Sequence, residues 1–237
     1  MKYIFLIAIL IKSSLGLAAL VSSIPSTYNE IGIPNSHLVT NNIIRGMAPR
    51  NHQDLEDLVE LNVQKYLLFK IDTNGEIAKE ITALIELGIS PKNILHLPFP
   101  WKDITDFKPV CEMTIEALNM LSLAERNNHK LFLHCTVGED RTGYIAGLFK
   151  LYNNANNESI DEIFASELCD KGFEAGNPKK IFHVAQKVRD NLTPAFLGMS
   201  ELIIANRGKK LTKNLCKKLV IPKVDFKKYS CKQSKLI

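Results

Sequence analysis

The chain of 237 residues is long enough for one domain of roughly 150–170 residues with extensions, and a domain of that size can form a hydrophobic core without disulfide staples. Neither an internal repeat nor a low-complexity run is present, which excludes a repeat protein. The charge is uneven: residues 207–237 hold eleven Lys/Arg and one acid, and the preceding residues hold 19 basic and 24 acidic ones. The net charge of +5 therefore belongs to the C-terminal segment.

The N-terminus is typical of a secretory leader. A positive start precedes an apolar run from Ile4 to Ile11, and Lys12 interrupts it, so the run is too short to span a bilayer. Either Gly16–Ala18 or Ser14–Gly16 supplies a small-x-small cleavage site. An N-terminal core helix is the alternative. We expect residues 1–23 to be a signal peptide and leader, and the protein to be periplasmic or secreted.

Strands and helices alternate in the middle of the chain. Apolar runs predict strands at Tyr66–Phe69, Ile94–Leu97 and Lys130–Leu133, and the spacing of apolar residues predicts helices at 54–61, 75–87, 109–126, 144–151 and 177–191. Gly88 ends the second of these helices, and Ser159 to Glu162 has the form of a capping box. The alternation predicts an α/β fold with a mainly parallel central sheet flanked by helices on both faces.

Four regions follow from this pattern. They are the leader 1–23, an N-terminal extension 24–40, the domain 41–195 and a basic C-terminal extension 196–237. Parallel strands place the loops at their carboxyl ends side by side, so these loops are expected to carry the chemistry.

Prolines at 98 and 100 end the predicted strand 94–97 and start a loop that contains Trp101, Lys102, Asp103 and Asp106. Asp106 lies three residues before Pro109, in a position to cap the helix that follows.

The segment from His134 to Gly143 reads His-Cys-Thr-Val-Gly-Glu-Asp-Arg-Thr-Gly and lies between a predicted strand and a predicted helix. A strand, a tight glycine-containing loop and a helix start form a backbone that binds anions, because the loop amides and the helix N-terminus both attract negative charge. We expect Cys135 to be a thiolate there, since a helix N-terminus and a nearby cation stabilise that form. Arg141 would hold two phosphate oxygens with its planar fork.

This segment resembles the signature His-Cys-x5-Arg-[Ser/Thr] of the cysteine-dependent protein-tyrosine and dual-specificity phosphatase superfamily, most closely its atypical bacterial and plant members. The resemblance implies a protein-tyrosine-phosphatase-like fold and hydrolysis of phosphate monoesters through a phosphocysteine, with no cofactor and no metal. It implies Cys135 as nucleophile, Arg141 as phosphate binder and Thr142 as the residue that assists the sulfur as leaving group. The phosphate-binding loop would consist of Thr136, Val137, Gly138, Glu139, Asp140 and Arg141, with His134 orienting it.

The resemblance also implies a general acid on a separate loop upstream. Asp103 follows Trp101 as in the Trp-x-Asp loops of bacterial members and is the expected acid, with Asp106 in reserve and Lys102 as a supporting residue. Residues 42–49 are similar to the strand and turn that open many atypical domains, in which the arginine, here Arg45, braces the acid loop. Lys70 stands where relatives often have arginine, and either lines the pocket or is a solvated strand-end residue.

The substrate stays open between two classes. A phosphoprotein is the superfamily default, and an inositol polyphosphate is the alternative, since exported bacterial members include phytases. Their usual Ala-Gly-x-Gly-Arg-Thr loop differs from the Val-Gly-Glu-Asp-Arg-Thr of this chain. A phosphate-binding module without turnover is a third reading. A monomer is expected.

The basic extension offers two interpretations. It binds a polyanionic substrate, a membrane surface or nucleic acid, or it is a solvated and partly mobile tail. Cys216 and Cys231 could be bridged in an oxidising compartment, while Cys111 and Cys169 have the pattern of buried helix thiols. The odd total of five cysteines fits one free reactive thiol.

Overall fold

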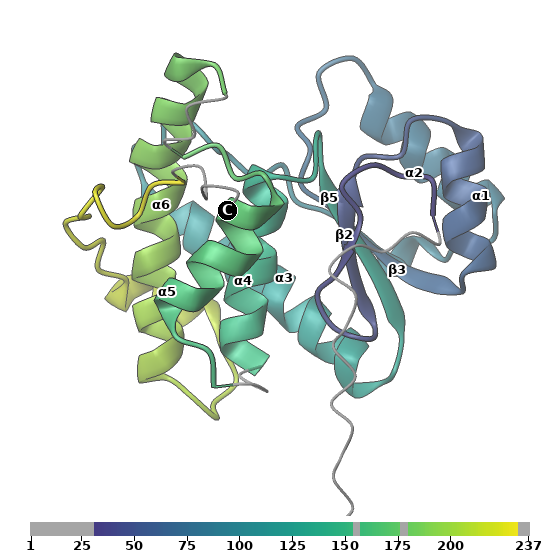
Figure 1. Cartoon of the computed structure of the whole chain (residues 1–237). Helices are drawn as coiled ribbons and strands as arrows, with labels where there is room; N and C mark the ends of the chain where they lie inside the picture. The colour runs from purple at the N-terminus through teal and green to yellow at the C-terminus, as the bar shows by residue number, and fades with distance from the viewer. Residues whose placement is uncertain (1–30, 154–156, 176–179, 232–237) are drawn as a thin grey trace, which may run out of the picture.

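The computed structural model describes residues 31–153, 157–175 and 180–231. A five-stranded sheet forms its central layer, with helices on either side of it (Figure 1). The sheet has the order β1-β2-β5-β3-β4. Its strands are β1 (His37–Leu38), β2 (Ile43–Met47), β3 (Val63–Leu68), β4 (Ile94–His96) and β5 (Lys130–Cys135). All neighbouring pairs are parallel except β1 with β2. The predicted mainly parallel sheet is confirmed.

Helices connect the strands and cover the sheet. They are α1 (His52–Glu60), α2 (Glu76–Glu86), α3 (Phe107–Arg126), α4 (Asp140–Asn153), α5 (Ile160–Ile163) and α6 (Phe182–Ala205). Shorter turns are the 3-10 segments η1 (Pro91–Asn93), η3 (Cys169–Lys171) and η4 (Lys213–Lys218), and the π-helical turn η2 (Phe164–Leu168). Within the described residues, no helix has the length and apolar character needed to cross a membrane.

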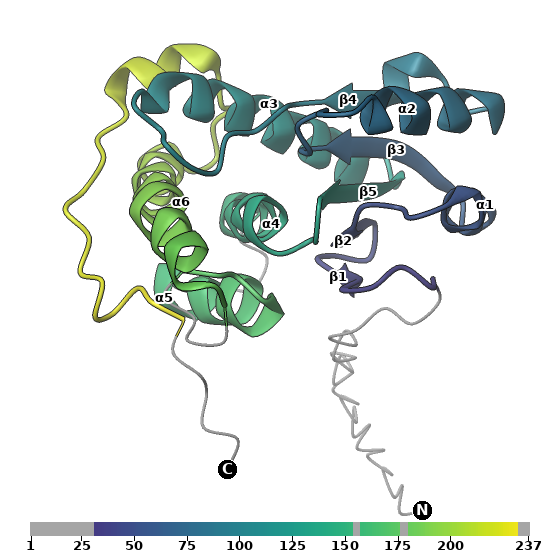
Figure 2. The same cartoon turned by 90° about the horizontal axis from the view of Figure 1, so that it is seen from above.

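The alternation of side chains along β5 explains why helices cover both faces of the sheet. Leu131 and Leu133 belong to a core formed with α3, α4 and α6, whereas Phe132 belongs to a second core formed with α1 and α2. Figure 2 shows α4 and α6 on one side of the strands and α1 on the other. Both cores bury their apolar side chains almost completely. Burial of each large apolar side chain stabilises the fold by about 1.5–3 kcal/mol. The predicted two-sided cover is confirmed.

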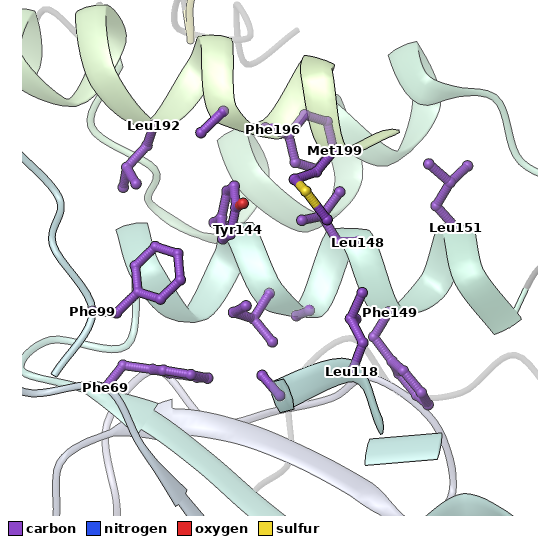
Figure 3. Close-up of a cluster of buried hydrophobic side chains, with 14 of the residues drawn as sticks. Phe69, Phe99, Leu118, Tyr144, Leu148, Phe149, Leu151, Leu192, Phe196 and Met199 are labelled. Carbon is purple, nitrogen blue, oxygen red and sulfur yellow. The ribbon is translucent and has the colours of Figure 1, made fainter. Parts of the chain in front are cut away.

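Helix α4 is buried on nearly all sides because the sheet, α3 and α6 enclose it. Figure 3 shows Tyr144 and Leu148 of this helix near Phe196 and Met199 of α6, whereas Phe149 points to the other side, beside Leu118 of α3. An aromatic chain links the layers: Phe69 lies 6.1 Å from Phe99, and Phe99 lies 5.2 Å from Tyr144, between ring centroids. This packing fixes the helix whose N-terminus follows the Cys135 loop.

Caps define several helix ends. Asp106 accepts a hydrogen bond from the Lys108 amide at 2.9 Å and caps α3, and Asn51 caps α1 in the same way. The capping box between Ser159 and Glu162 is present at the start of α5. These two caps, at 106 and 159, were predicted and are confirmed.

Helix α6 differs from the prediction at both ends. It begins at Phe182, whereas the predicted start at 177 lies outside the described residues, and it continues through Pro194 to Ala205 instead of ending near Asn191. Residues beyond the proline, among them Phe196 and Met199, are buried against the body of the protein. This burial outweighs the cost of a proline inside a helix. The predicted domain boundary at 195 therefore falls within a helix, and the extension 24–40 contributes β1 to the sheet.

The C-terminal segment is held against the domain by two disulfides, Cys111–Cys216 and Cys169–Cys231. The predicted bridge between Cys216 and Cys231 is wrong, and so is the prediction of free buried thiols at Cys111 and Cys169. Both bridges join the segment to the body, because α3 and η3 bring their cysteines to the surface that the segment crosses. Cys135 is the one free cysteine, as the odd count predicted.

Residues 207–231 are consequently a fixed strap and not a mobile tail. Figure 2 shows this segment passing along the outer side of α6 toward α5. Gly198 of α6 lies so close to the strap that a Cβ there would approach the Val220 carbonyl to 2.7 Å. The lysines of the strap are exposed, which fits both a solvated segment and a surface that binds anions, so both interpretations stay predictions.

Candidate active site

The candidate site is the phosphate loop, which we define as residues 135–141 between β5 and α4. Gly138 adopts φ +75°, and a Cβ at that position would lie 2.4 Å from the Gly46 carbonyl carbon. Only glycine satisfies both the left-handed backbone and the close approach of β2. The strand, loop and helix predicted from the signature are therefore present.

Cys135 ends β5 as a buried free thiol, 1% exposed. Thr142, in the first turn of α4, is fully buried, and its Oγ1 has no hydrogen-bond partner among the described residues. A buried hydroxyl without a partner costs free energy, so such groups are often reserved for a functional contact. The free thiol of Cys135 in the loop and the unpartnered hydroxyl of Thr142 just after it thus lie at the two ends of the same segment.

The Arg141 guanidinium is fixed at two points. Its Nη1 donates to the Phe69 carbonyl at 2.8 Å, and its Nη2 donates to Thr136 Oγ1 at 3.1 Å. The first contact ties it to the end of β3 and the second to the loop itself. The planar cation is therefore fixed at the phosphate loop, and its role in binding phosphate stays a prediction.

Arg45 braces the phosphate loop from below. This side chain on β2 is fully buried and donates to the carbonyls of Gly138 at 2.9 Å and Glu139 at 3.3 Å. It also donates to the Glu167 carbonyl. The resemblance implied that Arg45 braces the acid loop, and that prediction is wrong. Because Arg45 lies on the strand next to β5, it reaches the loop that β5 feeds.

The Glu167 carboxylate balances the buried charge of Arg45 at 3.5 Å. Burial lowers the pKa of Arg45, and Glu167 opposes that effect. Burial alone would raise the pKa of Glu167, but Lys171, Lys150 and Arg45 together hold it below its usual value. Lys171 lies 2.6 Å and Lys150 2.7 Å from its Oε1. Glu167 was not predicted from the sequence, where its one signal is a single acid in the mostly apolar stretch 163–168.

His134 orients the loop through hydrogen bonds, as predicted. Its Nε2 lies 2.8 Å from Glu80 Oε1 on α2, and its Nδ1 lies 3.2 Å from the Cys135 carbonyl. The ring also stacks on Phe132, with centroids 5.7 Å apart. Glu80 was not predicted from the sequence, because it belongs to a different element and has no motif of its own.

The acids of the loop have partners outside it. Lys180 forms an ion pair with Glu139 at 2.7 Å, and the Glu174 amide donates to Asp140 at 2.8 Å. Burial raises the pKa of Asp140 to about 7, and the nearby Glu174 and Glu139 add to the increase. Both acidic side chains thus join the loop to the segment that follows η3.

Asp103 lies in the loop between β4 and α3 with φ +54°, and its side chain is 65% exposed. Lys187 on α6 lies 3.2 Å from both carboxylate oxygens. No hydrogen bond joins Asp103 to the phosphate loop within the described residues. The neighbouring Ile104 amide donates to Asn191 Oδ1 at 2.7 Å and anchors this loop on α6.

Other predicted residues of the acid loop have structural contacts. Asp106 serves as the cap of α3, which is the alternative to its reserve role as acid. The Lys102 ammonium lies 5.3 Å from the Trp101 ring centroid, and Trp101 packs against the main core. Lys70 lies 3.2 Å from Glu76 and lines a small cavity at the carboxyl end of β3.

No protein-family model matches the chain, and no curated protein resembles it in sequence. Solved structures do resemble it. A point-mutant form of Tk-PTP superposes with a TM-score of 0.52 at 16% identity, over 72% of this chain and 97% of that one. P. aeruginosa TpbA gives 0.46 at 23% identity over 70% and 91%, and the core catalytic domain of the S. cerevisiae PP-IP phosphatase SIW14 gives 0.47 at 20% over 67% and 87%. The resemblance to Tk-PTP confirms the predicted fold.

Proposed function

We propose that this chain, which has the fold of the cysteine-dependent protein-tyrosine phosphatases, hydrolyses phosphate monoesters through a phosphocysteine at Cys135. The observation that carries the proposal is the free buried thiol at the first position of a loop over which Arg141 is fixed. The other four cysteines are consumed in disulfides, so the chain keeps one thiol free at the loop suited to an anion.

In the first step, the Cys135 thiolate attacks phosphorus in line, the sulfur–phosphorus bond forms and the bond to the ester oxygen breaks. The loop amides and the Arg141 fork stabilise the equatorial oxygens in the transition state. Asp103 donates its proton to the leaving oxygen. For this role Asp103 must break its ion pair with Lys187 and contact the leaving oxygen of the substrate instead.

In the second step, water attacks the phosphocysteine and Asp103 takes up its proton. The sulfur–phosphorus bond breaks, and the Thr142 hydroxyl donates a hydrogen bond to the departing thiolate. The unpartnered Thr142 Oγ1 supports this role. Arg45 and His134 keep the loop in position and do not take part in proton transfer.

We further propose that the protein works outside the cytosol. The leader that predicts export lies outside the described residues, but the two disulfides support the proposal, since such bonds persist in oxidising compartments. A phosphoprotein substrate, expected from the resemblance, stays a prediction.

Phosphate release from p-nitrophenyl phosphate tests the reaction. Cys135→Ser should abolish turnover while phosphate still raises the melting temperature of the variant, because the Arg141 fork and loop amides remain. Turnover that survives Cys135→Ser would overturn the mechanism. A wild-type protein that binds phosphate without releasing it from any ester would indicate a binding module.

A further inference from the structure

A cavity of about 420 Å³ lies where the ends of α3 and α4 meet the start of the strap. Asn119 and Arg126 line it from α3, Tyr152 lines it from the last turn of α4, and Lys209 and Lys210 line it from the strap. Pockets that hold a whole small molecule are usually about 300–1,000 Å³, so this cavity is large enough for one.

The cavity is separate from the phosphate loop. Helix α4 begins at Asp140, within that loop, and its 14 residues end at Asn153, which also lines the cavity. At a rise of 1.5 Å per residue, the two ends of α4 are about 20 Å apart. A phosphate ester bound at Cys135 therefore does not occupy this cavity.

The charged side chains that line the cavity are all positive. They are Arg126, Lys209 and Lys210, and no acid lines it. All three residues are exposed, and none of them forms an ion pair with any residue that the structure describes. Arg126 donates to Ser122 Oγ at 3.0 Å, which holds it on the face of α3 but leaves its charge unbalanced. The cavity thus carries three uncompensated positive charges.

The acids on the surrounding elements do not offset these charges. Glu116 of α3 pairs with Lys213 at 2.6 Å, and Glu125 accepts a hydrogen bond at 2.7 Å from the turn before β2. Glu201 of α6 does not line the cavity. Helix α4 beyond its first turn and the strap ahead of Asp225 contain no acid. The carboxyl ends of α3 and α4 contribute only about half a negative charge each.

The strap wall of the cavity is fixed. Gly208 turns the chain back after α6 with φ +74°, and Leu211 is buried at 1% exposure. Asn119 Nδ2 donates to the Leu211 carbonyl at 3.3 Å, and the disulfide Cys111–Cys216 follows a few residues later. The two lysines between these anchors are therefore held beside Arg126.

A neutral polar group accompanies the three cations. The Tyr152 ring packs against the main core, and its hydroxyl forms no hydrogen bond with any residue in the described part of the chain. Cations from two different elements that surround one concave site complement a compact ligand with several negative charges better than a single anionic group.

We infer that this cavity binds a small soluble polyanion, a molecule that carries several phosphate, sulfate or carboxylate groups, through Arg126, Lys209 and Lys210. The inference goes beyond the proposed reaction and does not depend on it, because the two sites share no residue.

Titration of ¹⁵N-labelled protein with tripolyphosphate tests the inference. The amide signal of Asn153 reports on the cavity, and the amide signal of Gly138 reports on the phosphate loop. The Asn153 signal should shift and saturate. Replacing Lys209 and Lys210 together by alanine should raise the Kd taken from this signal about tenfold or more, since hydrogen bonds to charged groups are lost. The Kd from the Gly138 signal should stay unchanged.

The matched control replaces Lys217 and Lys218 by alanine. These lysines are also exposed and lie on the same strap, but they do not line the cavity. The control removes the same charge and should leave the Asn153 titration unchanged. An equal loss of affinity in both double variants would show diffuse attraction to the strap and would overturn the site, as would an Asn153 signal that does not saturate.

Sedimentation with vesicles separates a soluble ligand from a lipid headgroup. The vesicles contain equal parts of phosphatidylcholine and phosphatidylglycerol. Binding to them that requires Lys209 and Lys210, together with no response to tripolyphosphate, would overturn a soluble ligand in favour of a membrane surface.

Hydrolysis of p-nitrophenyl phosphate, measured on the same proteins, separates this inference from the proposed reaction. If no ester is hydrolysed but the Asn153 titration behaves as expected, the reaction fails and the cavity site stands. If hydrolysis is present and the Asn153 signal does not respond, the reaction stands and the cavity site fails.

Discussion

Arg45 and Glu167 form a buried ion pair directly beneath the phosphate loop, although 122 residues separate them in the sequence. The Arg45 guanidinium also donates hydrogen bonds to the carbonyls of Gly138 and Glu139 in the loop. The shape of the phosphate loop thus depends on an ion pair that lies outside the loop.

Arg45→Met should destabilise the protein by about 3–5 kcal/mol, because it strands a buried carboxylate and several carbonyl acceptors. Urea unfolding measures the loss. Arg45→Lys keeps the charge but not the fork, so it should lose less stability and still lower kcat. An Arg45→Met protein with the wild-type unfolding midpoint would contradict the role of the pair.

The two disulfides should account for much of the stability of the strap. Replacing Cys111 and Cys216 together by serine removes a bridge that spans 105 residues, for which loop entropy gives an upper value of about 4.7 kcal/mol. Unreduced protein in denaturant should show one titratable thiol, and five after reduction. Peptide mapping that finds Cys216 joined to Cys231 would refute the observed pairing.

Asp140 should make stability depend on pH near neutrality. Its pKa of about 7 in the folded protein exceeds the usual 3.8, so the folded state holds a proton that the unfolded state has lost. Stability should therefore fall as the pH rises from about 4 to about 7, by at most ~4 kcal/mol. Asp140→Asn keeps an acceptor for the Glu174 amide and should abolish this fall.

Urea midpoints at pH 5 and pH 8 check the expectation. The urea midpoint of Asp140→Asn relative to that of the wild type should be higher at pH 8 than at pH 5. Identical differences at both pH values would show that Asp140 titrates normally in the folded protein.

Asp103 should matter most for poor leaving groups. Asp103→Asn should lower kcat about 10²- to 10⁴-fold with phenyl phosphate, and much less with p-nitrophenyl phosphate, whose leaving group needs no proton. Asp106→Asn is the control, since asparagine also caps helices and the α3 cap survives. The reverse outcome would transfer the role of acid to Asp106.

The sequence was most informative where the structure depends on local geometry. The phosphate loop follows from a strand, a glycine and a helix start. The caps at Asp106 and Ser159 follow from side chains that accept hydrogen bonds from nearby backbone amides. Each of these features lies within a few residues of its cause. The mainly parallel sheet also follows from the alternation of strands and helices.

The features that the sequence did not predict all depend on contacts between distant segments. In the sequence, several cysteines are possible disulfide partners of Cys216. Only the path of the strap over α3 selects Cys111. Glu167 and Glu80 acquire their roles from the elements packed beside them. Helix α6 continues past Pro194 because its far end is buried, which local propensity does not show.

The most direct test of the central claim is to trap the intermediate. The protein is mixed with p-nitrophenyl phosphate, quenched in acid within the first turnover and digested for mass spectrometry. We predict a phosphoryl group on the peptide that carries Cys135, absent from Cys135→Ser and enriched in Asp103→Asn. Rapid phosphate release with no phosphoryl group on Cys135 in any of these proteins would contradict the account.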